Sequence, residues 1–250
     1  MLKSLLGLKP KAKRAEKRAV REELLAVDGA DVAVKVRLNP RARRIVMRVN
    51  PLSGDVVVTA PSRGGMGRAL DFVRGETQWI ARQLRHLPKP VPLLPDAVVP
   101  FMGVPHPIRH SQSRGPAPVW REEGALLVSG QVEHAPRRLI DFFKREARTL
   151  LASRALEYAA RLGVRPSRIT VRDTKSRWGS CSHSGSLSFS WRLMLAPEFV
   201  RDYVVAHEVA HLKEMNHSPR FWAQVKILSP DMARARQWLR DHGRTLLRYN

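Results

Sequence analysis

The stretch PEFVRDYVVAHEVAHLKEMNHSPRFW, residues 197–222, decides how this chain is interpreted. Its first half places apolar residues at helical spacing, which predicts a buried helix carrying the sequence HEVAH. His207 and His211 are four residues apart, so both imidazoles lie on one face of that helix, about one turn apart. This spacing suits two ligands of one metal ion, and Glu208, beside the first ligand, is placed to act as a general base.

A third histidine, His217, stands at the eleventh position counted from His207. In a chain of this composition a chance HExxH is expected about 0.015 times, and requiring the third histidine lowers that to about 0.0005. The helix must end after His211 and the chain must turn back, so that His217 can approach the metal from outside the helix. Metzincins use a glycine for this reversal, whereas this chain has Glu214 there. That departure argues against metzincin membership, and Asn216, which tolerates left-handed conformations, is the better candidate for the turn.

Three protein ligands predict a catalytic zinc site, because the fourth position stays open for water. Zinc lowers the pKa of such a water from about 15.7 to around 7. Glu208 can accept the proton as the water attacks a polarised carbonyl or phosphoryl group. We expect one Zn²⁺ per chain. A fourth ligand from Cys181 or His183 would instead make the site structural.

The stretch KSRWGSC, residues 175–181, is rich in hydrogen-bond donors. Arg177 is a candidate catalytic residue that stabilises an oxyanion or binds a phosphate, and the alternative is that it packs on Trp178. Cys181 has no basic partner to activate it, which favours a packing role. Apolar and polar residues then alternate over 187–191, which predicts a strand at a sheet edge that aligns an extended substrate.

The N-terminal part of the chain divides into two segments. Residues 1–27 carry eight Lys or Arg with little apolar periodicity, which predicts a mobile basic arm. Over 28–87, alternating apolar residues and Asn-Pro turns predict an antiparallel β meander, followed by a helix at about 66–87.

The C-terminal part divides into two further segments. Five prolines over 88–100 open a connector with short strands, which we place at 88–134. Residues 135–250 form the metal-binding catalytic domain, which begins with a helix over 136–162. The predicted fold class is α+β, with an antiparallel β-rich N-terminal subdomain.

Composition limits the class of protein. Lys and Arg number 45 against 22 Asp and Glu, a net charge of +23, and such a surface attracts polyanions, so nucleic acid is a candidate partner. A single cysteine excludes an intramolecular disulfide framework and fits a reducing compartment. No run approaches the roughly 18 apolar residues of a membrane helix, and the first residues lack the order of a signal peptide. We therefore expect a soluble, cytoplasmic protein without a membrane span.

The order KSRWGSCS, a short strand, RLMLAP and DYVVAHEVAHLKEMNHSPRFW resembles the YgjP-like family of predicted zinc metallopeptidases, which is related to SprT-like and WLM domains. RARRIVMRV and ETQWIARQL fit the N-terminal half of that family, so the resemblance covers about residues 30–243. It implies a zincin-like α+β catalytic domain, with His207, His211 and His217 on zinc and Glu208 as base.

We predict a zinc-dependent hydrolase, specifically a metallopeptidase acting on polypeptide. One alternative keeps the metal and hydrolyses a nucleotide or another phosphoanhydride, using the cationic surface and Arg177. A second alternative is a nucleic-acid-associated protein with a structural zinc. Comparing nucleotides with unstructured polypeptides as substrates distinguishes the two hydrolases.

Overall fold

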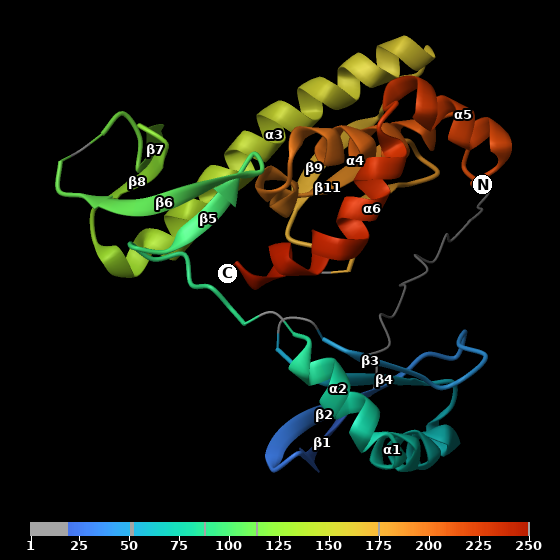
Figure 1. Ribbon diagram of the computed structural model, residues 1–250. Helices are drawn as coiled ribbons and strands as arrows, with labels where there is room; N and C mark the ends of the chain where they lie inside the picture. The colour runs from blue at the N-terminus through green and yellow to red at the C-terminus, as the bar shows by residue number, and fades with distance from the viewer. Residues whose placement is uncertain (1–19, 51–52, 88, 114, 175, 250) are drawn as a thin grey trace, which may run out of the picture. The chain divides into compact units, whose positions relative to one another are not determined.

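The computed structural model describes residues 20–50, 53–87, 89–113, 115–174 and 176–249, so most of the predicted basic arm lies outside the described residues. The chain divides into two compact units, Met1–Leu87 and Pro88–Asn250 (Figure 1). Each unit has its own hydrophobic core.

The first unit contains one four-stranded sheet, in the order β1-β2-β4-β3, and two helices. Its elements are β1 (Val20–Val27), β2 (Ala30–Leu38), β3 (Val46–Val49), β4 (Val56–Ala60), α1 (Met66–Gly75) and α2 (Thr77–Arg85). A meander would pair β2 with β3, but β2 instead pairs with β4 in parallel. The reason is apolar content: Val36 and Val58 face each other in register with no exposed surface, and the less buried β3 takes the edge.

Strand β1 corrects the predicted arm, which extended to residue 27. It pairs with β2 along its whole length through a two-residue turn at Asp28 and Gly29. Both turn residues have positive φ, 47° and 80°, which the Asp-Gly pair adopts readily in hairpins. The sequence pattern did not predict this strand because the first half of the strand is charged. An edge strand tolerates such charged residues.

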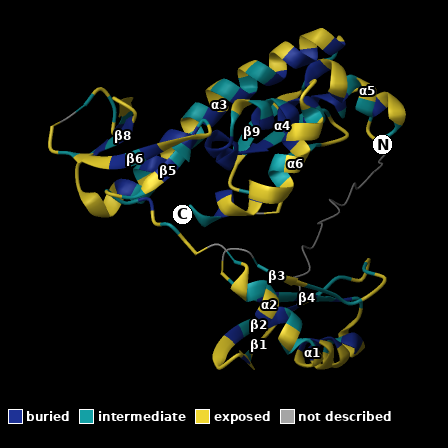
Figure 2. Ribbon diagram, viewed as in Figure 1, coloured by how far each residue is buried: buried dark blue, intermediate teal, exposed yellow. Residues whose placement is uncertain are grey.

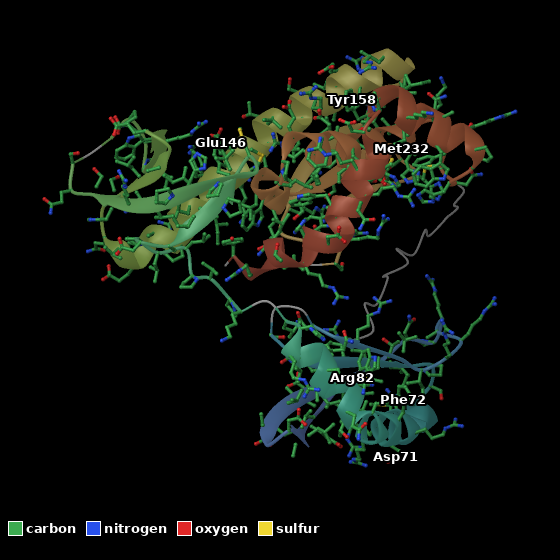
Figure 3. The ribbon with its side chains drawn as sticks, in the orientation of Figure 1. Asp71, Phe72, Arg82, Glu146, Tyr158 and Met232 are labelled. Carbon is green, nitrogen blue, oxygen red and sulfur yellow. The ribbon has the colours of Figure 1, made fainter. Side chains whose placement is uncertain are left out.

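The predicted helix over 66–87 is two helices, α1 and α2, separated at Glu76. Leu70, Val73 and Ile80 lie on their buried faces and belong to the core of this unit. Phe72, labelled in Figure 3, is 42% exposed and lies outside that core.

Over its described residues, the second unit contains a four-stranded sheet in the order β5-β6-β8-β7, a three-stranded sheet in the order β10-β11-β9, and four α-helices. The first sheet comprises β5 (Val98–Phe101), β6 (Val104–Ser111), β7 (Val119–Glu122) and β8 (Ala125–Ser129). Then follow α3 (Ala135–Leu162), β9 (Arg168–Arg172), β10 (Gly179–Cys181), β11 (Ser186–Ser190), α4 (Glu198–Ala210), α5 (Pro219–Leu228) and α6 (Met232–His242). Short 3₁₀ turns η3 (Trp191–Leu195) and η4 (Gly243–Arg248) precede α4 and follow α6.

The predicted connector contains a whole sheet, because residues 98–129 supply all four strands β5 to β8, and the apolar faces of these strands share one core with α3. The same core includes α4, which is largely dark blue in Figure 2. At its centre Trp191 is fully buried and stacks on Phe143, with ring centroids 5.6 Å apart. The α+β fold class is confirmed. Over the described residues, no helix combines the length and apolar character needed to cross a membrane.

Candidate metal centre

Helix α4 supplies the first two histidines and the carboxylate between them. His207 and Glu208 lie in its last turn, and His211 directly follows its final residue. Val205 and Val209 on this helix have no exposed surface, so α4 is held in the core. The predicted helix therefore presents its HEVAH segment from a rigid element.

The chain reverses after α4 without a left-handed residue: Asn216 lies in the turn, but the left-handed conformation expected of it is wrong, because none of the described residues 211–218 has positive φ. The N–H groups of Leu212 and Glu214 instead donate to carbonyls of the last helical turn. The Asn216 side-chain oxygen accepts from the N–H of Ser218 at 3.3 Å, and Ser218 in turn caps α5. Side-chain hydrogen bonding replaces the backbone freedom of glycine at this turn.

His217 is brought back to the helix by this turn, and the three imidazoles converge. One ring nitrogen from each of His207, His211 and His217 lies within 4.8 Å of the others. The Nε2 atoms of His207 and His217 are 3.2 Å apart. Tetrahedral ligands at zinc–nitrogen distances of 2.0–2.1 Å are about 3.3 Å apart, so the residues present fit a zinc ion.

The hydrogen bond of His211 fixes which of its nitrogens is free. Its Nδ1 lies 3.1 Å from the backbone oxygen of Glu214, which can only accept, so Nδ1 carries the proton. The lone pair of Nε2 is then available for a metal. The Nδ1 atom of His207 is buried and has no partner among the described residues.

The pKa values of His207 and His211 favour the neutral form of the imidazole, which is the form that binds metals. Burial, followed by the neighbouring His211 and His217, lowers the pKa of His207 to about 4. Burial also lowers the pKa of His211. Both imidazoles are therefore neutral near pH 7, as metal ligands must be.

Phe221 on α5 packs against all three histidines. Its ring centroid lies 4.9 Å from that of His207, 4.5 Å from that of His211 and 4.8 Å from that of His217. Phe221 itself has no exposed surface. It forms the apolar wall that positions the imidazoles, a role that sequence analysis missed because only the tertiary fold shows it.

Glu208 lies against the backbone of β10. It is only 7% exposed, and a Cβ built on Gly179 would lie 2.5 Å from its Cγ and 2.7 Å from its Oε1. Only glycine at position 179 leaves room for this carboxylate. Burial raises the pKa of Glu208 to about 7, with the nearby charge of Arg177 acting in the opposite direction. A glycine within a strand pattern signals such a close approach, and this signal was present in KSRWGSC.

The remaining candidates occupy the loop before β10 and the strand itself. Arg177 is exposed on that loop, close enough for its charge to act on Glu208. Burial raises the pKa of the Cys181 thiol to about 11, with Glu208 adding to the shift, so the thiol is not activated. Neither Cys181 nor His183 belongs to the histidine cluster found among the described residues.

The predicted edge strand is wrong in its position. The alternating segment forms β11, which pairs with β9 on one side and β10 on the other, so it lies at the centre of its sheet. The edge beside Glu208 is β10. Alternating apolar residues predicted a strand correctly, but they indicate burial, which is greater at the centre of a sheet.

The chain matches the model of a known protein family. A family model described as YgjP-like, metallopeptidase domain, matches residues 43–242. A search of curated proteins finds no match. Among solved structures, the crystal structure of the metallopeptidase zymogen of Pyrococcus abyssi abylysin is similar, with 24% sequence identity and a TM-score of 0.33. That similarity covers 40% of this chain and 97% of the other.

Proposed function

The chain belongs to the YgjP-like metallopeptidase family, and from that premise we propose that it is a zinc-dependent peptidase whose ion is held by His207, His211 and His217. One observation carries the proposal. One imidazole nitrogen from each of the three histidines lies within 4.8 Å of the others, at the end of α4 that also carries the buried Glu208 carboxylate.

A zinc ion held there would polarise the scissile carbonyl and make an attacking water more acidic. Glu208 accepts one proton from that water while the water oxygen bonds to the carbonyl carbon. The carbon–nitrogen bond then breaks, and Glu208 returns the proton to the leaving nitrogen. Contact with the backbone of Gly179 holds the carboxylate in position for both transfers.

Arg177 is the residue we assign to the developing negative charge. Its guanidinium acts electrostatically on Glu208, so it lies close to the place where the carbonyl oxygen gains charge. A fixed cation at that position stabilises the transition state more than the uncharged ground state.

The free edge of β10 supports binding of an extended polypeptide. Ser190 donates to the Trp178 carbonyl and Ser182 to the Ser186 carbonyl, which fixes the hydrogen-bonded positions of the β10–β11 ladder. Since these positions alternate, the backbone groups of Gly179 and Cys181 face away from β11. We propose that the substrate pairs with them as an added strand.

The experiment is hydrolysis of an unstructured polypeptide by the wild type and by Glu208→Gln at matched zinc content. We expect the variant to retain zinc and to lose at least about a hundredfold in kcat, because general acid–base catalysis contributes 10²–10⁴. Glu198→Gln, at the exposed other end of α4, is the matched control and should keep wild-type activity.

Two results would contradict the proposal. Wild-type turnover by Glu208→Gln would remove the assigned base. Hydrolysis of nucleotides without hydrolysis of polypeptide would replace the peptidase with a phosphoanhydride hydrolase.

A further inference from the structure

A cavity of roughly 180 Å³ opens between the loop before β10 and the end of α6, and Trp178, the residue before Gly179, is part of its lining. Its apolar surface comes from Trp178, Leu239 and Leu247. Two guanidinium groups, those of Arg177 and Arg244, also line it. The cavity is thus an apolar recess with two cationic residues.

Position in the chain connects this cavity to the proposed site. Arg177 and Trp178, which line the cavity, are the two residues before Gly179, and the backbone of Gly179 lies against Glu208. A substrate paired with β10 would therefore place one of its residues at the cavity.

The cavity is built by close packing of two segments far apart in the sequence. A Cβ on Gly243 would lie 3.3 Å from the Trp178 ring, so the end of α6 packs directly on the indole. Leu246 belongs to the core and fixes the following 3₁₀ helix η4 against it, and the neighbouring Leu247, which lines the cavity, is also buried. These contacts hold the cavity walls in place without a ligand.

The charges of the cavity have no partner in the protein. No ion pair joins Arg177 or Arg244 to an acidic side chain within the described part of the chain, although other arginines in this unit, such as Arg154 and Arg192, form such pairs. Both arginines are exposed, so their charges are accessible to an anionic ligand. Arginine pairs with a carboxylate in a bidentate manner, which makes a carboxylate the best complement.

Size limits the ligand further. Sites for small molecules and nucleotides usually occupy about 300–1,000 Å³, whereas this cavity accommodates a single side chain. The apolar walls suit a short aliphatic chain, and the arginines suit the carboxylate at its end.

We propose that this cavity is a specificity pocket for a carboxylate-bearing residue of the polypeptide substrate, with Arg244 as the specificity-determining residue. The proposal rests on the proposed peptidase function. The carboxylate belongs to a glutamate side chain or to the C-terminus of the peptide, and both present the same group to Arg244, while Arg177 keeps its role at the scissile carbonyl.

The test compares peptides that differ only in this group. Glutamate is replaced by glutamine at each position in turn, and the C-terminus is either free or amidated. We expect the wild type to prefer one carboxylate-bearing member by about tenfold to a hundredfold in kcat/KM, mainly through KM. Sensitivity to amidation identifies the C-terminal carboxylate, and sensitivity to glutamine identifies the side chain.

Arg244→Gln should abolish that preference by raising KM for the carboxylate-bearing peptide to the value for the neutral peptide. Arg240→Gln removes an equal charge from exposed α6 outside the cavity, so it should keep the preference. A wild type without preference, or a preference that survives in Arg244→Gln, would overturn the proposal.

Binding to the Glu208→Gln variant separates this inference from the proposed function. Anisotropy of labelled peptides should show tighter binding of the carboxylate-bearing member, and Arg244→Gln in that background should remove the difference. If no peptide is hydrolysed by the wild type, the peptidase assignment fails. If peptides are hydrolysed and the binding difference is missing, the pocket assignment fails alone.

Discussion

The position of the Glu208 carboxylate depends on the absence of a side chain at Gly179. The carboxylate side chain occupies the space that a methyl group at position 179 would need. Since α4 is buried around Glu208, the helix cannot move away, and any larger residue at position 179 must displace the carboxylate itself.

Gly179→Ala should therefore separate activity from metal binding. We expect kcat for peptide hydrolysis to fall at least about tenfold, because a base displaced by a fraction of an ångström transfers protons poorly. Zinc content should stay at the wild-type value, since the three histidines lie elsewhere on α4 and its return turn. Gly67→Ala, where nothing lies near the added methyl, is the control and should retain full activity. Equal activity in both variants would contradict the assigned contact.

Residue spacing predicts the candidate metal ligands and the candidate base, but it predicts few of the residues that hold them in position. His207, His211, His217 and Glu208 were identified from spacing, because helical periodicity determines which side chains share a face. Phe221 and the Glu214 carbonyl were not identified, since both reach the histidines only after the chain reverses. The Asn216 prediction failed for the same reason: a turn can be closed by side-chain hydrogen bonds that spacing does not reveal.

At the scale of elements, β10 is the strand with which we propose that the substrate pairs. Its three residues pair with β11 on one side only, so the outward backbone groups of Gly179 and Cys181 remain available. An edge strand this short resists self-association, yet it can pair with one extended peptide.

N-methylated peptides test this pairing. Methylation of a substrate amide that pairs with β10 should lower kcat/KM by about 2- to 13-fold, the equivalent of one hydrogen bond worth 0.5–1.5 kcal/mol. Methylation at the next residue, whose amide points the other way, should have a smaller effect. A flat response along the peptide would contradict strand pairing.

Element types were easier to predict than element neighbours. Periodicity located β11 and α3 well, but it placed β11 at an edge and described β2 to β4 as a meander. Neighbours depend on which strands bury most apolar surface, a property of the whole sheet. The hairpin turn of β1 was visible at Asp28 and Gly29, although the charged start of the strand concealed it.

At the scale of the whole molecule, two cores lie in two units. Ile80 belongs to the core of Met1–Leu87 and Leu151 to that of Pro88–Asn250, and neither has exposed surface. The family match at residues 43–242 includes parts of both units. Attraction of polyanions by the net charge of +23 stays a prediction from composition.

Separate cores predict two unfolding transitions. Ile80→Ala and Leu151→Ala should each cost about 2–5 kcal/mol, because each leaves a cavity in a packed interior. In calorimetry each variant should lower one transition and leave the other in place. The transition lowered by Leu151→Ala should also rise when zinc is added, since the histidines belong to that unit. A single transition lowered by both substitutions would contradict independent units.

X-ray absorption at the zinc edge of the metal-loaded protein counts the ligands of the ion and so tests the three-histidine site. We expect one zinc per chain with three imidazole nitrogens at about 2.0–2.1 Å and no sulfur. Replacing His217 with Gln should reduce the imidazole count to two. A spectrum with a sulfur ligand or a fourth imidazole, or an unchanged spectrum after the His217 substitution, would contradict an open three-histidine metal site.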